Sequence, residues 1–153
     1  MRIKKQQQPP SPAPPHQGGR VSNSFVGLYN ESPIGVFDSG LGGLTVVKEL
    51  ISVLPRENIV YFGDTARVPY GSKSKEAIIR FSIENAKILV ARGVKIIVVA
   101  CNSSSSFAIN QLKGNFDIPI LGVIQPGVRQ AVNKTKNFRV GVIATSATIQ
   151  SFS

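Results

Sequence analysis

The chain of 153 residues is poor in the residue types that build disulfides, metal centres and membrane spans. It has one cysteine, Cys101, one histidine, His16, and no apolar run of about 18 residues that could cross a bilayer. A single cysteine excludes an internal disulfide, and the shortage of Cys and His ligands argues against a zinc site. A Cys–His hydrolase would have to use His16, which lies in a polar tail. We therefore expect no metal and no membrane association.

Acidic residues are missing from the first thirty positions, although the chain as a whole carries a formal net charge of +10. Glutamine, proline and glycine dominate positions 6–19, and such a stretch buries too little apolar surface to offset its ordering entropy. We predict a disordered, basic, Pro-rich tail over residues 1–31. A basic surface can bind nucleic acid, but it is more often only solvated, and its positive field also suits a small anionic substrate. No nucleic-acid partner is expected.

Beyond the tail, short β-branched runs alternate with amphipathic segments. The pattern predicts strands over 34–37, 58–62, 95–100, 119–124 and 138–144, and helices over 44–54, 74–90, 104–112 and 127–133. Gly93 is placed to end the second helix. Strands that alternate with helices indicate the α/β class, with three layers and a mostly parallel sheet covered on both faces.

Ligands of such folds bind at the carboxyl ends of the strands. The residues at these ends are Asp38-Ser39, Gly63-Asp64, Cys101-Asn102 and Thr145-Ser146. The glycine-rich turn at 40–43 could indicate a nucleotide site, but a dinucleotide fingerprint requires glycine or alanine where Thr45 stands. The carboxylate of Asp38 would also repel a pyrophosphate. A tight strand-to-helix turn explains the glycines equally well.

Cys101 is the most informative single residue, because it follows a buried strand and precedes a serine-rich segment that is predicted to open a helix. A thiol beside a helix N-terminus faces unpaired N–H groups, which favour the thiolate. Asn102 and the hydroxyl groups after it could bind a carboxylate. A lone cysteine can equally be a small buried hydrophobic residue. With no histidine nearby, the composition favours a thiolate base over a hydrolase nucleophile.

Three segments resemble the signature of the glutamate racemases, a family of the aspartate/glutamate racemase superfamily. They read GVFDSGLGG at 35–43, GDTARVPYG at 63–71 and ACNS at 100–103, in the order and with the spacing of the family. The Pro-Tyr-Gly segment separates this family from the related aspartate racemases. The resemblance covers residues 33–153. It implies a first α/β racemase domain over 32–125, incomplete here, and the start of a second α/β domain over 126–153, truncated at its end.

The resemblance also implies roles for individual residues. Cys101 matches the first of two catalytic cysteines, and Asp38 with Ser39 matches a pair that contacts the substrate ammonium and assists proton transfer. The remaining substrate contacts implied are Tyr70, Gly71, Asn102 and Ser103. The family has threonine at position 103, so serine keeps the hydroxyl and loses a methyl group. Thr145 and Thr148 match a later segment that also touches substrate in the family.

The function implied is cofactor-independent interconversion of L- and D-glutamate by two cysteine bases, in the cytoplasm, for peptidoglycan synthesis. No cofactor and no metal are expected, glutamate is the expected small-molecule partner, and a homodimer is among the assemblies that the resemblance allows. One alternative is an aspartate racemase or another amino-acid racemase of the superfamily. Another is a non-catalytic fragment that binds a small anion or nucleic acid.

Residues 1–153, expressed alone, are expected to lack racemase activity. The second family cysteine lies in a Gly-Cys-Thr-His segment that does not occur among these residues, and inversion requires bases on both faces of the substrate. Circular dichroism of L-glutamate solutions would measure turnover. Turnover that disappears on Cys101→Ala would show that the second base had been misplaced.

Overall fold

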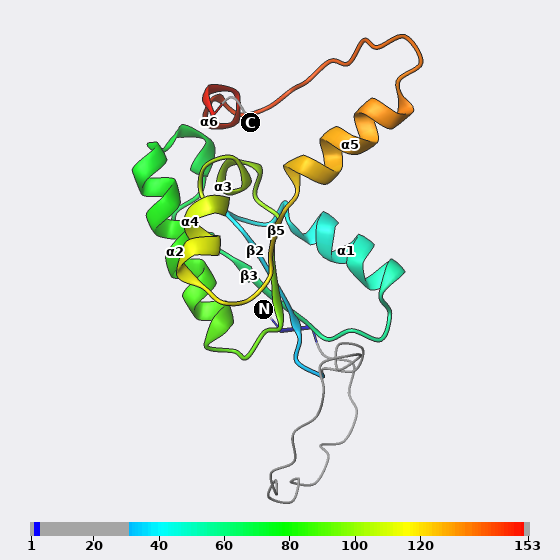
Figure 1. The fold of residues 1–153 in the computed structure, drawn as a ribbon. Coiled ribbons are helices and arrows are strands. Elements are labelled where there is room, and N and C mark those ends of the chain that lie inside the picture. Colours follow the sequence, from blue (N-terminus) through cyan, green and yellow to red (C-terminus); the bar gives the residue numbers. More distant parts are fainter. Residues whose placement is uncertain (1, 4–30, 152–153) are drawn as a thin grey trace, which may run out of the picture.

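A five-stranded sheet forms the centre of the computed structural model, which describes residues 2–3 and 31–151. The strand order is β1-β3-β2-β4-β5 (Figure 1). Four strands are parallel: β2 (Ile34–Asp38), β3 (Ile59–Gly63), β4 (Ile96–Val99) and β5 (Ile120–Gly122). The predicted α/β class with a mostly parallel sheet is therefore confirmed.

The fifth strand, β1 (Arg2–Ile3), pairs antiparallel with β3 at the edge of the sheet. This pairing departs from the disorder predicted for residues 1–31. The rest of that prediction concerns residues 1 and 4–30, which lie outside the described residues, and residue 31 carries no regular structure.

Helices cover both faces of the sheet (Figure 1). One face carries α2 (Lys75–Val90), α3 (Asn102–Phe107) and α4 (Ile109–Asn115), and the other carries α1 (Leu44–Val53). The remaining helical elements are η1 (Tyr70–Ser72), α5 (Ile124–Lys134) and α6 (Ser146–Gln150). None of the helices in the described part of the chain has the length and hydropathy that crossing a membrane would require.

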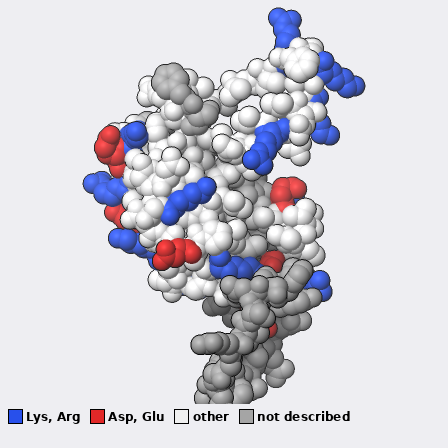
Figure 2. All heavy atoms as spheres, viewed as in Figure 1, with Lys and Arg blue, Asp and Glu red and all other residues white. Residues whose placement is uncertain are grey.

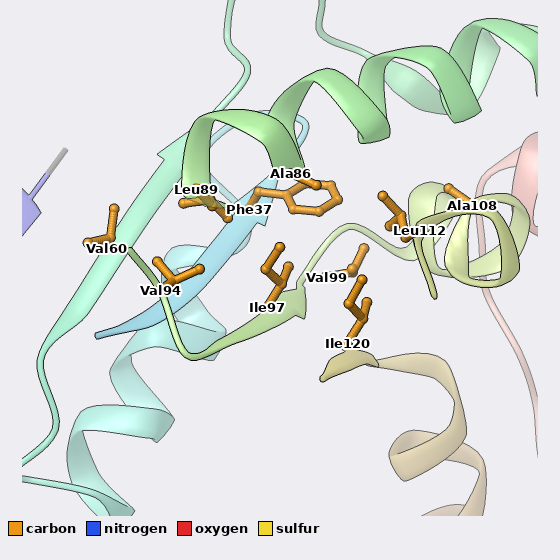
Figure 3. Packing of buried hydrophobic residues seen from close by; sticks show 10 residues of the cluster. All are labelled: Phe37, Val60, Ala86, Leu89, Val94, Ile97, Val99, Ala108, Leu112 and Ile120. Atoms are coloured by element: carbon orange, nitrogen blue, oxygen red, sulfur yellow. The ribbon is translucent and has the colours of Figure 1, made fainter. Parts of the chain in front are cut away.

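The core follows from the period-two alternation of the strands. Along β2, Phe37 points to the α2 side while Val36 points to the α1 side, and both are fully buried. Figure 3 shows the larger cluster, in which the sheet residues meet Ala86 and Leu89 of α2 and Leu112 of α4. Because both faces are covered, the strands read as continuous apolar runs.

The ends of α2 are those that the sequence predicts. The Ser74 hydroxyl accepts a hydrogen bond from the backbone N–H of Ala77 at 3.2 Å, which caps the first turn. Gly93 follows the last turn with φ 69°, a left-handed conformation that glycine adopts without steric cost.

Two predicted elements differ in the structure beyond shifts at their ends, the largest of which is the start of α5 at Ile124 instead of residue 127. The single helix expected over 104–112 is two helices, α3 and α4, which meet at Ala108. The first begins already at Asn102, because Cys101 has extended backbone angles and its carbonyl accepts the first helical hydrogen bond, from the N–H of Ser105 at 2.8 Å.

The strand predicted over 138–144 is wrong. No regular structure is assigned there, and Phe138 has φ 57°, which lies outside the β region. The apolar side chains of this segment are exposed, with Val142 at 74% and Ile143 at 102%, and no strand among the described residues pairs with it. A β-branched run therefore does not suffice for a strand without a hydrogen-bonding partner.

The core predicts a measurable difference between two neighbouring residues of α2. Leu89 is fully buried against the sheet, whereas Val90 is 38% exposed. We expect Leu89→Ala to lower the free energy of unfolding by about 2–5 kcal/mol, because it leaves a cavity in a close-packed core. Val90→Ala is the control and should change it by less than about 1 kcal/mol. Equal effects in urea denaturation would contradict this placement of the core.

Candidate active site

Three parallel strands end side by side and bring the predicted site residues to one edge of the sheet. Asp38, the last residue of β2, is paired with Gly63, the last residue of β3. On the other side of β2, Phe37 is paired with Val99 of β4, and the N–H of Ala100 donates to the Phe37 carbonyl at 2.9 Å. Cys101 therefore follows the strand that neighbours Asp38, as the rule for parallel sheets predicts.

The glycine-rich turn after β2 closes on the carboxylate of Asp38. The Asp38 Oδ2 atom accepts hydrogen bonds from the N–H groups of Gly40, at 3.2 Å, and Gly43, at 2.9 Å. Asp38 is only 7% exposed, so these bonds compensate for the loss of water around its charge. Two N–H groups that a phosphate loop would offer to a ligand are thus occupied by the protein itself, which argues against a nucleotide site.

Close contacts make glycine necessary in this turn and at the neighbouring end of β3. A Cβ atom on Gly43 would lie 2.6 Å from the Cβ of Asp38, and one on Gly63 would lie 2.3 Å from the carbonyl oxygen of Gly40. The turn therefore packs directly against the end of β3. Without side chains, the glycines allow the turn after β2 and the end of β3 to lie in direct contact.

Tyr61 is a functional neighbour that the sequence analysis did not single out. Its hydroxyl donates to the Gly40 carbonyl at 2.7 Å, and the side chain is buried beneath the turn. Burial and then the nearby Asp38 and Cys101 raise the pKa of Tyr61 to about 12, so it stays a protonated donor near neutral pH. A tyrosine inside an otherwise apolar strand is the signal that could have revealed it, because a buried hydroxyl requires a partner.

Cys101 lies at the N-terminus of α3, with a side chain that is 4% exposed. It belongs to a small cluster with Tyr70, Ile78 and Ala147, against which Phe107 packs. The thiol therefore sits in largely apolar surroundings at the end of a buried strand. Such an environment excludes water from whatever reaction occurs there.

The residues after Cys101 differ in exposure. Asn102 is exposed, while Ser103 is buried and its hydroxyl lies 3.2 Å from the Thr145 hydroxyl. Thr145 in turn caps α6 and lies 3.1 Å from the Thr148 hydroxyl. These contacts place the segment before α6 over the start of α3.

Tyr70 and Gly71 reach the same region from the loop after β3. Tyr70 is buried in the cluster of Cys101, and a Cβ on Gly71 would lie 2.7 Å from the Cβ of Thr145. The structure thus gathers Asp38, Cys101 and Ser103 with this loop and with Thr145. Ser39 is half-buried in the turn after Asp38.

No group of three or more metal-ligating side chains occurs within residues 2–3 and 31–151. A hollow of about 410 Å³ lies elsewhere, on the outer side of α2, and includes none of the predicted site residues. It is lined by Glu76, Ile79, Arg80, Ile83, Glu84 and Lys87.

The charge near the C-terminal elements is positive. Residues 118–151 contain four basic and no acidic residues, and Figure 2 shows Lys and Arg side chains gathered around α5 and the segment after it. These basic residues are Arg129, Lys134, Lys136 and Arg139. A field of this sign attracts small anions toward the molecule.

Comparison with known proteins identifies the family of the chain. Residues 34–152 match the family model described as Asp/Glu/Hydantoin racemase. The chain belongs to this family. The glutamate racemase of Persephonella marina is 58% identical over 118 residues, which make up 77% of this chain and 46% of that protein. The resemblance to the glutamate racemases is confirmed.

Solved structures of the family show the same fold. The glutamate racemase from Aquifex pyrophilus matches with a TM-score of 0.76 and 53% identity, over 78% of this chain and 47% of that chain. The enzyme from Francisella tularensis, solved in complex with D-glutamate, matches with a TM-score of 0.73 and 50% identity, over 80% and 46%. The chain thus spans about half the length of the relatives that it matches, and the predicted fold type is confirmed.

The turn around Asp38 predicts effects of different size for two adjacent glycines. Gly43→Ala places a Cβ at 2.6 Å from the Cβ of Asp38, whereas a Cβ on Gly42 has its nearest neighbour at 3.6 Å. Neither glycine has a positive φ, so backbone strain does not distinguish them. We expect Gly43→Ala to lower the free energy of unfolding by about 1–3 kcal/mol and Gly42→Ala by less than about 0.5 kcal/mol. A Gly43→Ala variant as stable as wild type in urea denaturation would contradict the closed turn.

Proposed function

We propose that this chain supplies one half of the active site of a glutamate racemase, in which the Cys101 thiolate exchanges a proton with the α-carbon on one face of the substrate. The observation that carries the proposal is the position of a buried cysteine, one strand away from the buried Asp38, at the carboxyl edge of a parallel sheet. Identity of 58% to a glutamate racemase over 118 residues supports the choice of substrate.

The reaction requires two bases. One base removes the α-proton, and a second protonates the opposite face, because a single base in one place would mostly return the proton to its original side. Cys101 is the one cysteine of residues 1–153, so a second thiol must come from another polypeptide segment. No cofactor or metal enters this proposal.

The surroundings of Cys101 suit the removal of a weakly acidic proton. The α-proton of an amino acid leaves only when the site stabilises the carbanion with positioned donors in a dry environment. Cys101 is 4% exposed, and Asp38 is held at the neighbouring strand end by two backbone N–H groups. We assign Asp38 and Ser39 to the substrate ammonium, with Asp38 also assisting proton transfer.

The substrate carboxylates require hydrogen-bond donors. The hydroxyls of Ser103 and Thr145 lie 3.2 Å apart, and Gly71 packs against Thr145. We assign Ser103, Asn102, Tyr70 and Gly71 to substrate binding, with Thr145 and Thr148 at the same place. The binding of D-glutamate by the Francisella tularensis relative supports a site for this amino acid.

The biological role follows from the product. We infer that D-glutamate made by this enzyme enters peptidoglycan synthesis, and that the enzyme works in the cytoplasm, where the precursors of the cell wall are assembled. Assembly into a homodimer stays a prediction, which sedimentation of the intact protein would test.

Cys101 is the residue whose replacement tests the proposal. In the intact protein, Cys101→Ala and Cys101→Ser should each lower the racemisation rate by at least about 10²-fold, the usual contribution of a general base. Serine is a poor replacement because its hydroxyl is a far weaker acid than a thiol. Circular dichroism of L- and D-glutamate solutions would measure the rates, and aspartate would be assayed alongside to identify the substrate.

Ser106→Ala is the matched control. The Ser106 side chain lies on the same short helix, and its hydroxyl donates to the Asn102 carbonyl at 2.9 Å. This variant should keep at least about half of the wild-type rate. A Cys101→Ala enzyme with nearly wild-type turnover would reduce Cys101 to a buried packing residue and refute the proposal. Glutamate binding by wild type without any turnover would instead indicate a binding module.

A further inference from the structure

The hydroxyl of Tyr70 is buried and fully engaged by two polar side chains. It donates to the Asp64 carboxylate and accepts a hydrogen bond from Asn85 Nδ2 at 3.0 Å. Tyr70 is 1% exposed, Asp64 is 4% exposed and Asn85 is fully buried. The hydroxyl is therefore engaged by protein groups, and the loop that carries Tyr70 is held by its own side chain.

Arg67 closes these contacts into a ring. Its Nε donates to Asp64 Oδ2 at 2.7 Å and its Nη2 donates to Asn85 Oδ1 at 3.1 Å, so the four residues Asp64, Tyr70, Asn85 and Arg67 form a closed cycle of hydrogen bonds. The guanidinium also pairs with Glu84 and lies 4.3 Å from the centroid of the Phe81 ring. Three members of the cycle come from the loop after β3, and the fourth, Asn85, comes from α2.

The charges in the ring are balanced. Burial lowers the pKa of Arg67, but the hydrogen bond to Glu84 and the charge of Asp64 outweigh it, so the guanidinium stays protonated. Burial and the hydrogen bond to Asp64 raise the pKa of Tyr70, so the phenol remains a donor. Three members are buried and the Arg67 side chain is 29% exposed. A largely buried network with every member satisfied has a single preferred geometry, and the loss of one member leaves others without partners.

The loop that the ring holds continues directly into the site. Gly71 follows Tyr70, and a Cβ on Gly71 would lie 2.7 Å from the Cβ of Thr145. Thr145 then meets Ser103, two residues after Cys101, at 3.2 Å between the hydroxyls. A shift of Tyr70 would therefore reach Gly71, Thr145 and Ser103 through direct contacts.

We propose that Asn85 is a positioning residue for the reaction: it fixes the loop of residues 64–71 through the Tyr70 hydroxyl and Arg67, and so sets the place of Tyr70 in the cluster of Cys101 and of Gly71 beside Thr145. The inference rests on the proposed function for its kinetic consequence. Its structural consequence, the coupling of Asn85 to the loop, can be measured whether or not the protein racemises glutamate.

The kinetic test compares Asn85→Ala with Ala86→Gly in the intact protein. Ala86 is the next residue of α2 and is fully buried, and glycine weakens the helix there without touching the ring. We expect Asn85→Ala to raise the KM for glutamate about tenfold with kcat changed less than about threefold, because substrate contacts are displaced while the base stays in place. Ala86→Gly should leave KM within about twofold of wild type at a similar loss of melting temperature.

Tyr70→Phe keeps the aromatic side chain and removes only the hydroxyl. It is the second test variant, to be used if Asn85→Ala does not fold. It should raise KM by a similar factor, and the double variant Asn85→Ala, Tyr70→Phe should be no worse than the more affected single variant, because both act through one contact. An unchanged KM in Tyr70→Phe, or effects of the two single changes that multiply in the double variant, would overturn the inference.

Amide hydrogen exchange of the 153-residue chain separates failure of this inference from failure of the proposed function. Asn85→Ala should speed exchange across residues 64–71 and shift the Gly71 amide resonance, while Ala86→Gly should leave both unchanged. If the intact wild-type protein lacks racemase activity and this coupling is present in the 153-residue chain, the function is wrong and the positioning stands. If exchange in the loop is the same in both variants and in wild type, the positioning role is wrong.

Discussion

The parallel pairing of β2 with β3 on one side and with β4 on the other is the constraint on which the site depends. In this register Asp38 is paired with Gly63 and Phe37 is paired with Val99. The loops that follow the three strands therefore start from the same edge of the sheet. Hydrogen bonds of a parallel ladder fix this alignment along the whole strand. Packing on both faces then holds the register, because a slip by one residue would exchange the side chains that face the two helical layers and disrupt both clusters.

Polar side chains at the carboxyl edge of the sheet already form hydrogen bonds within the protein. Among the residues that the structure describes, no buried side-chain nitrogen or oxygen lacks a hydrogen-bond partner. Asp38 is held by the turn after β2, and the loop after β3 is held by Asp64 and Asn85. Preorganised donors and charges of this kind act without reorganising during a reaction, and such preorganisation is the main way a site without a cofactor can stabilise a carbanion.

The sequence predicts the local features well, because they depend on neighbours in the chain. The four parallel strands, the start of α2 next to Ser74 and its end at Gly93 all follow from periodicity and from residue-specific backbone preferences. Three of the strand ends named from the sequence are adjacent in the structure. The split of the helix at Ala108 and the missing strand at 138–144 depend on packing partners, which periodicity does not reveal. Tyr61 and Asn85 were not identified because their partners lie 21 and 15 residues away.

The most direct measurement of the central claim is deuterium incorporation at the α-carbon of glutamate, followed by mass spectrometry in D₂O with the intact Cys101→Ala protein. A base that serves one face of the substrate predicts asymmetry. One enantiomer should still exchange its α-proton, through the base that remains on the other face, while exchange of the opposite enantiomer falls by at least about 10²-fold. Exchange of both enantiomers at the wild-type rate, or equal loss from both, would contradict the assignment of Cys101 as the base on one face.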